Sequence, residues 1–436
     1  MASQNTNKKV HIISLGCVKN TVDSEIIAGG LESAGIELTD DPNQANTIIV
    51  NTCGFIGDAK QESVDVILEA AQLKKDGQLE ELLVAGCLSA RYKKQLTLEM
   101  PEVDKFFVTE DFRRIFKHIA AKPHLADDPD HRRKLLTRRH YAYLKISEGC
   151  DNVCSFCAIP LMRGKQRSRD IESLVKEAHS LVARGVRELM VIAQDSTTYG
   201  WDLKPKRYLH ELLTELDKIE GLDWIRLHYA HPSHFSRKLI PVLKNAKRIV
   251  PYLDIPVQHA SSNMLSAMKR GLDADGLRRL LLNLREEIPN LKLRTSIIVG
   301  FPGETEEDFE TLMNFLDEIK FDRLGVFTYS EEEDTSGALL KDDVTQGQKV
   351  DRMDAVMQLQ HGISFEKNQA LIGQSLDVII DAKDPENDDQ MIGRTVWDAP
   401  EIDQVVYVSG SLDPGSIVKA VIEDAGPYEL YASAKI

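Results

Sequence analysis

The first part of the chain alternates between two hydrophobic patterns. Short apolar runs predict buried strands, and stretches with an apolar residue at every third or fourth position predict helices. Strands that alternate with helices through short connections form a parallel sheet covered by helices. We therefore expect an open parallel-sheet α/β domain over residues 1–125. The predicted strands are 10–15, 47–51, 82–85 and 106–108, and the predicted helices are 23–33, 60–75 and 90–99.

The alternation stops over residues 126–140, which are polar and predict a linker. It resumes over residues 141–368, where six strands separated by helices predict a full or partial (β/α) barrel of the TIM type. The predicted strands are 142–146, 188–193, 225–228, 252–257, 292–299 and 323–327, with helices between them, such as 171–184 and 305–319.

The last segment, residues 369–436, has a third pattern. Short apolar runs at 374–381, 390–396, 404–408 and 417–423 are separated by Gly, Pro, Asp and Asn, which predicts a small antiparallel β-barrel. The segment holds 13 acidic and 4 basic residues, a net charge of −9. Such a module suits a basic protein better than RNA, because phosphate neutralisation dominates nucleic-acid affinity. The alternative is that the acidity only aids solubility.

Five basic residues lie close together in the predicted linker. A short charge run is most often a solvated surface, and we favour that interpretation over a contact with phosphate or with an acidic neighbouring domain. The residues are Arg132, Arg133, Lys134, Arg138 and Arg139.

The composition excludes several classes of protein. The chain of 436 residues is 42% hydrophobic and 28% charged, which is normal for globular domains. The net charge of −15 argues against a surface that binds phosphate throughout. No apolar run reaches the roughly 18 residues of a membrane span, and the start lacks a signal-peptide core, so we expect a cytoplasmic protein with no membrane partner. In that reducing compartment, the six cysteines indicate metal or redox chemistry rather than disulfides.

Three cysteines, Cys150, Cys154 and Cys157, are spaced C-x3-C-x2-C directly after a predicted strand. Three thiolates on one loop can each hold one iron of a cubane cluster, which leaves the fourth iron open. A structural zinc site normally has four ligands in paired spacings, and the second pair is absent from the sequence. We therefore favour a [4Fe-4S] cluster over zinc or over three packed thiols.

The other three cysteines, Cys17, Cys53 and Cys87, are dispersed, but each follows a predicted strand. The carboxyl ends of parallel strands meet along one edge of the sheet, where ligands bind. We therefore expect the three thiols to converge and to hold a second [4Fe-4S] cluster with one open iron. The alternative is three separate buried thiols, since free cysteine packs as a small hydrophobe. Neighbouring glycines that would let the backbone crowd together are Gly16, Gly54 and Gly86.

The C-x3-C-x2-C loop resembles the signature of the radical S-adenosylmethionine (SAM) superfamily. The resemblance implies that the open iron chelates SAM and that reductive cleavage gives a 5′-deoxyadenosyl radical. It also implies that Phe156 lies near the adenine, and that 296–304 is the fifth-strand segment near the adenine and ribose. Active sites of such barrels gather at the carboxyl ends of the strands. The other candidate SAM contacts are Gln194, Asp195, Gln258, Arg294, Ser296 and Gly300.

Two cysteine sets and a C-terminal barrel together resemble the radical SAM methylthiotransferases, over essentially the whole chain. The motifs at 14–25, 154–160, 193–200 and 252–259 are similar to the branch that modifies a ribosomal protein, known as RimO. The transfer-RNA branch favours Gln-Met-Asn after the first cysteine, where this chain has Val18-Lys19-Asn20.

Several functional expectations follow from this resemblance. It implies methylthiolation of the β-carbon of an aspartate in the twelfth small-subunit ribosomal protein. It also implies a C-terminal barrel of the TRAM, OB-like type and an electron donor of the flavodoxin or ferredoxin type, with an unknown sulfur donor. The alternatives are a transfer-RNA adenosine methylthiotransferase and, less favoured, a ribosome-associated iron–sulfur sensor.

Overall fold

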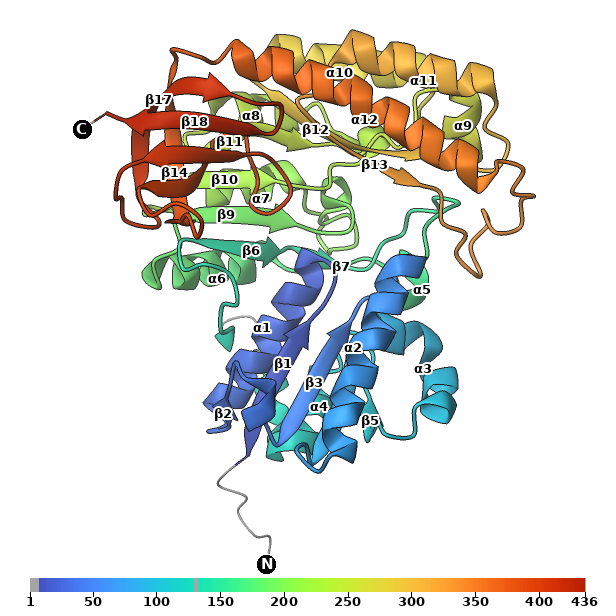
Figure 1. Ribbon diagram of the computed structural model, residues 1–436, viewed down its shortest axis with the longest axis vertical. Helices are drawn as coiled ribbons and strands as arrows, with labels where there is room; N and C mark the ends of the chain where they lie inside the picture. The colour runs from blue at the N-terminus through green and yellow to red at the C-terminus, as the bar shows by residue number, and fades with distance from the viewer. Residues whose placement is uncertain (1–7, 129–131, 436) are drawn as a thin grey trace, which may run out of the picture.

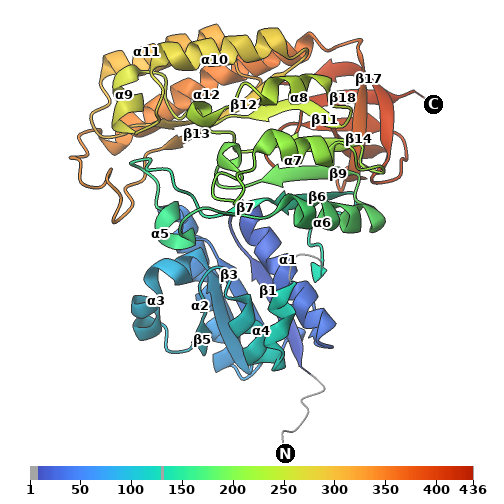
Figure 2. The same ribbon diagram turned by 180° about the vertical axis from the view of Figure 1, so that it is seen from behind.

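The computed structural model describes residues 8–128 and 132–435 (Figure 1). Residues 129–131 of the predicted linker therefore lie outside the described residues. None of the described helices is both long and apolar enough to cross a membrane. Figures 1 and 2 show an N-terminal α/β domain below a larger sheet, with a small barrel beside that sheet.

The N-terminal domain is a five-stranded parallel sheet in the order β2-β1-β3-β4-β5, which confirms the predicted open sheet. Alternate residues of each strand face opposite sides. Helices α1 and α4 cover one face, and α2 and α3 cover the other. Strand β2 and helix α4 were not predicted. The elements are β1 (Lys9–Ser14), α1 (Val18–Ser33), β2 (Glu37–Leu38), β3 (Thr47–Thr52), α2 (Gly57–Lys75), β4 (Glu81–Gly86), α3 (Cys87–Glu99), β5 (Lys105–Phe106) and α4 (Phe112–Ala120).

The central domain is a six-stranded parallel sheet in the order β13-β12-β11-β10-β9-β6. Its edge strands β6 and β13 do not pair within the described residues, so it is a partial barrel. The strands are β6 (Tyr141–Lys145), β9 (Glu188–Ile192), β10 (Trp224–Leu227), β11 (Ile249–Asp254), β12 (Lys292–Val299) and β13 (Arg323–Thr328), beside the two-stranded β7 (Ser147–Glu148) and β8 (Arg167–Ser168). The helices are α5 (Ile159–Arg163), α6 (Ile171–Ala183), α7 (Leu209–Leu216), α8 (Leu239–Asn245), α9 (Ser262–Ala267), α10 (Ala274–Glu287), α11 (Glu306–Ile319) and α12 (Gln346–Gln369).

The C-terminal module is a closed barrel in the order β14-β15-β16-β18-β17. Four neighbouring pairs are antiparallel, and the β16–β18 pair is parallel. The strand β18 was not predicted, because its apolar positions are mostly small alanines. The strands are β14 (Ser375–Lys383), β15 (Gln390–Thr395), β16 (Val405–Ser409), β17 (Ile417–Ala425) and β18 (Glu429–Ala434).

The barrel is fastened to the central sheet by buried ion pairs as well as by apolar packing around Tyr252. Arg394 lies 2.8 Å from Glu188, and Arg323 lies 2.6 Å from Asp398. Several acidic residues of the module thus form ion pairs within the protein. The charge that the module offers to a partner is therefore smaller than its net charge of −9 suggests.

Helix α1 joins the N-terminal domain to the central domain. Of its 16 residues, 12 are buried, so it is enclosed on nearly all sides rather than amphipathic. One apolar cluster contains Val22 and Ile26 of this helix together with Tyr143 of β6 and Met190 of β9. Because the two sheets share this core, their relative position is fixed by packing.

Candidate active site between the two cysteine sets

The dispersed cysteines lie at the carboxyl edge of the N-terminal sheet. Cys17 follows β1 and caps α1, Cys53 follows β3, and Cys87 begins α3 directly after β4. In a sheet of order 2-1-3-4-5, ligands bind at the switch point between the first and third strands. Cys17 and Cys53 lie on either side of that point. Cys53 and Cys87 are buried, and Cys17 is exposed.

The three thiols are close enough to influence one another electrostatically. The pKa of Cys87 is raised to about 12, mainly by burial, with Arg163 opposing the rise and Cys17 and Cys53 adding to it. Burial likewise raises the pKa of Cys53, with a further contribution from Cys17. Three thiols gathered at one sheet edge fit a metal cluster, because coordination stabilises the deprotonated form.

Gly16 provides the room for this arrangement. Its φ of +82° lies in the left-handed region, and an added Cβ would lie 2.6 Å from Cys53 Cβ and 2.8 Å from its Sγ. Any side chain at this position would therefore push directly on a candidate ligand.

Replacement of Gly16 by alanine is expected to lower the iron content, because the methyl group displaces Cys53. The matched control is Gly35→Ala, which has a φ of +83° but no atom within 4 Å of the added Cβ. Both variants bear the left-handed strain of about 1–2 kcal/mol, so both should lose some stability. Only Gly16→Ala should lose iron in a colorimetric assay after reconstitution, and equal iron in the two variants would contradict the role of Gly16.

The close cysteines lie on the loop between β7 and α5, at the carboxyl edge of the central sheet. Burial raises the pKa of Cys150 to about 11 and that of Cys157 to about 12. Two donors point at sulfur: the amide of Asn152 lies 3.4 Å from Cys150 Sγ, and Arg270 Nη1 lies 3.2 Å from Cys154 Sγ. Hydrogen bonds to sulfur are a feature by which proteins tune iron–sulfur clusters, so this set also fits a cluster.

The loop is braced from the side opposite the thiols. The amide of Ser155 donates to the carbonyl of Met268, and its hydroxyl donates to the carbonyl of Ala267 at 2.8 Å. Phe156 packs in an apolar cluster with Met264, Met268 and Phe301. The ligand loop is therefore anchored on α9 and its continuation.

Helix α5, which begins two residues after the close set, lies against the dispersed set. Cys87 packs against Ala158, Ile159 and Met162, which directly follow Cys157. Asn20 links the same two regions, because its Oδ1 lies 3.8 Å from Cys87 Sγ and accepts a 2.5 Å hydrogen bond from Arg163. Residues far apart in the sequence thus form one site.

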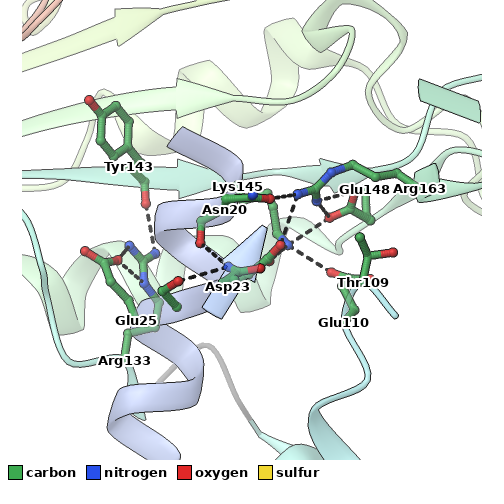
Figure 3. Close-up of polar contacts among 12 residues, drawn as sticks. Asn20, Asp23, Glu25, Thr109, Glu110, Arg133, Tyr143, Lys145, Glu148 and Arg163 are labelled. Carbon is green, nitrogen blue, oxygen red and sulfur yellow. Dashed lines mark hydrogen bonds and ion pairs between the residues drawn. The ribbon is translucent and has the colours of Figure 1, made fainter. Parts of the chain in front are cut away.

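A buried ionic network surrounds this contact (Figure 3). Lys145 binds Asp23 at 2.5 Å, Glu110 at 2.9 Å and Glu148 at 2.9 Å. Arg163 donates two hydrogen bonds to Glu148 and contacts Asp23 at 3.2 Å. Although burial alone would raise it, the pKa of Glu148 is far below its ordinary value because of Lys145 and Arg163. Burial outweighs the two cations at Asp23 and raises the pKa of that carboxyl.

The prediction that the basic run is a solvated surface is wrong for Arg133. Only 2% of this residue is exposed, and it binds Glu25 of α1 and Glu177 of α6, each at 2.5 Å. The neighbouring-domain alternative is thus the right one for Arg133. The sequence of the basic run does not show which of its side chains is buried, because that depends on the direction in which the folded backbone points each one. Arg132, Arg138 and Arg139 are exposed, although Arg138 donates to the carbonyl of Asp381 in the barrel.

Two candidate SAM contacts lie beside the close cysteines. Gln194 and Asp195 follow β9, and Gln194 donates to Glu148 Oε1 at 3.1 Å. Asp195 accepts hydrogen bonds from Asn152 of the ligand loop and from His234, both at 2.8 Å. These contacts bring the end of β9 to the loop that carries the thiols.

Four further candidates remain: Gln258 follows β11, and Arg294, Ser296 and Gly300 lie on or directly after β12. Gln258 has a φ of 71°, and its amide donates to the carbonyl of Ser296 at 2.9 Å. Gly300 has a φ of +73°, with Lys349 where a Cβ would lie. Arg294 is paired within the chain, at 3.0 Å from Asp254. The assignment of these residues as SAM contacts stays a prediction.

The sequence patterns missed several residues that shape this site. Lys145 ends an otherwise apolar strand, and a charge at such a position was a signal for a buried partner. The sequence does not indicate a role at the thiols for Asn20, Arg163 or Arg270. Each of them lies in a helix or loop that is far along the chain from the sulfur atom that it approaches.

Comparison with known families agrees with this division of the chain. Residues 9–108 match the model described as uncharacterized protein family UPF0004, residues 144–316 match the radical SAM superfamily, and residues 372–434 match the TRAM domain.

Solved structures share the fold at low sequence identity. The radical SAM methyltransferase TsrM from Kitasatospora setae, with tryptophan substrate and a SAM analogue, has a TM-score of 0.55 at 15% identity and covers 73% of each chain. The cobalamin-dependent SAM radical enzyme OxsB has a TM-score of 0.52 at 13% identity, over 81% of this chain and 56% of its own.

Closer relatives match over nearly the full length. A protein of Anaeromyxobacter sp. (strain K) is 48% identical over 97% of this chain and 92% of its own. One from Aquifex aeolicus (strain VF5) is 45% identical over 97% of this chain and 96% of its own. Both are named ribosomal protein uS12 methylthiotransferase RimO. With its domains, its two cysteine sets and relatives of this identity, the chain belongs to the RimO family of radical SAM methylthiotransferases.

Proposed function

We propose that this protein attaches a methylthio group to the β-carbon of an aspartate in ribosomal protein uS12. The observation that carries the proposal is that Cys87 of the N-terminal domain packs against the segment that directly follows the close set, which brings cysteine sets of two domains to one site. A reaction that joins a radical carbon to sulfur needs two such centres side by side. Full-length relatives named for this activity support the choice of substrate.

We assign one [4Fe-4S] cluster to Cys17, Cys53 and Cys87 and a second to Cys150, Cys154 and Cys157. When bound to the second cluster, SAM supplies on reduction the 5′-deoxyadenosyl radical that removes hydrogen from the substrate carbon. The amide of Asn152 and the guanidinium of Arg270 stabilise the thiolates of that set. The candidate SAM contacts around this set are Phe156, Gln194, Asp195, Gln258, Arg294, Ser296 and Gly300.

The chain's own residues fix the geometry of the reaction. Arg163 and Lys145 bind carboxylates of both domains, so they hold the two thiol sets in one orientation. Burial of this network limits the access of solvent to the region between the two thiol sets.

We further propose a cytoplasmic location, where ribosomes and reduced electron carriers of the flavodoxin or ferredoxin type occur. The sulfur donor is not identified by any feature of the chain. The acidic residues of the barrel that remain outside its ion pairs are suited to dock a basic ribosomal protein.

Mass spectrometry of ribosomes and transfer RNA from cells with and without this gene tests the proposal. We expect a methylthio group on one aspartate of uS12 only when the gene is present. Loss of a methylthiolated adenosine from transfer RNA instead would show that the transfer-RNA alternative is correct. If neither product depended on the gene, the methylthiotransferase proposal would be wrong.

A further inference from the structure

Lys19 is a buried lysine whose ammonium group forms no ion pair with a carboxylate among the described residues. Only 7% of it is exposed. Its Nζ lies 3.1 Å from the centroid of the Tyr229 ring, while no carboxylate in the described ranges lies within 4.0 Å of it. Lys145, which is similarly buried, binds three carboxylates. A buried charge normally has such partners, because removing it from water is costly.

The position of Lys19 places this charge between the two halves of the site. It lies in the first turn of α1, two residues after Cys17. The Tyr229 ring beneath it belongs to the segment that follows β10, at the carboxyl edge of the central sheet. The ammonium group interacts electrostatically with Cys17 of the dispersed set and with Glu148, which directly precedes the loop of the close set.

The local structure holds Lys19 and Tyr229 in place and gives the ammonium group no direct carboxylate contact, although Cys17, Asp254 and Glu148 attract it from farther away. Tyr229 has a φ of 60°, which is rare for an aromatic residue, and its amide donates to Asp254 Oδ2 at 3.1 Å. Asp254 itself is paired with Arg294 at 3.0 Å. The carboxylate of Asp254 is thus already paired with Arg294. The Tyr229 ring gives Lys19 only the weaker attraction of a cation–π contact.

We propose that Lys19 is a specificity-determining residue that binds the side-chain carboxylate of the aspartate to be modified. This inference rests on the proposed function. The carboxylate is bonded directly to the β-carbon, so an ion pair with Lys19 would place the reacting carbon one bond from a fixed atom. A neutral asparagine or a nucleobase would leave the ammonium group without a partner.

A binding cycle with the cluster-loaded enzyme tests this role. The ligands are intact uS12 and uS12 in which the modified aspartate is replaced by asparagine. The enzymes are wild type, Lys19→Met, Lys19→Arg and the surface control Lys134→Met. A charge-assisted hydrogen bond of about 1.5–3 kcal/mol corresponds to roughly a 10- to 100-fold difference in Kd. We expect this preference for aspartate in the wild type and in Lys134→Met, its loss in Lys19→Met, and its partial retention in Lys19→Arg.

Two further readouts separate specificity from structure. Iron content and 5′-deoxyadenosine formation without uS12 should be unchanged in Lys19→Met. If that variant instead lost iron, or kept the full aspartate preference, the role of Lys19 would be wrong while the proposed function stood. If the wild type modified no aspartate of uS12, the proposed function would be wrong, and the role of Lys19 would fail with it.

Discussion

Replacing Cys17, Cys53 and Cys87 together with alanine is expected to halve the iron content, from about eight to about four per chain, and to abolish methylthiolation. Cleavage of SAM to 5′-deoxyadenosine should continue, because the loop with Cys150 keeps its own donors and its anchoring on α9. SAM cleavage should survive the loss of methylthiolation because the two cysteine sets lie at the edges of two different sheets.

This prediction is tested by iron analysis, electron paramagnetic resonance and chromatography of 5′-deoxyadenosine. The matched control is the reciprocal variant, in which Cys150, Cys154 and Cys157 become alanine. It should also retain about four irons, but it should form no 5′-deoxyadenosine. An iron-free reciprocal variant would mean that the dispersed cysteines are only packed thiols, and a dispersed-set variant that still methylthiolates uS12 would contradict the two-centre mechanism.

Replacement of Arg133 by alanine is expected to destabilise the protein by about 3 kcal/mol, because Glu25 would be left buried without a cation, while Glu177 would keep Arg169 at 2.6 Å. Glu25 is fully buried, and Glu177 is 1% exposed, so water cannot replace the guanidinium. The thermal midpoint should fall on the order of 10 °C.

Arg132→Ala is the control for this change. Arg132 is the preceding residue and is exposed, and its Nη1 donates to the carbonyl of Leu125. Its loss should shift the midpoint by only about 1–2 °C, since exposed polar contacts contribute little. Differential scanning fluorimetry of both variants decides the matter, and equal shifts would show that burial of the Arg133 triad is not what stabilises the domain contact.

The sequence predicts the architecture here better than it predicts the site. Strand and helix periods are local, so the order of elements and the place of each cysteine after a strand could be found without a structure. Convergence of Cys17, Cys53 and Cys87 then followed from the rule that parallel strands end at one edge. The elements that were missed are those with weak periodicity, such as β2 with two residues and β18 with alternating alanines.

Contacts between domains were beyond such reasoning. Nothing local marks Lys19 or Arg133 as buried. The position of Lys145 at the end of an apolar strand indicates a buried partner, but it does not identify Asp23 or Glu110 as that partner. Their roles depend on which face of α1 meets β6, and that follows from packing between segments more than 100 residues apart, as for Glu25 and Arg133.

The enclosure of α1 limits how this gene could be divided or recombined. A chimera that took its N-terminal segment from a distant relative would bring a foreign α1 to Tyr143, Lys145 and Arg133. The new helix would have to match an apolar surface and two buried cations at once. Expression of residues 1–125 alone would expose the same helix to solvent, and insolubility would be the result. The working unit for engineering is therefore the whole chain, and exchanged parts must include both sides of the α1 contact.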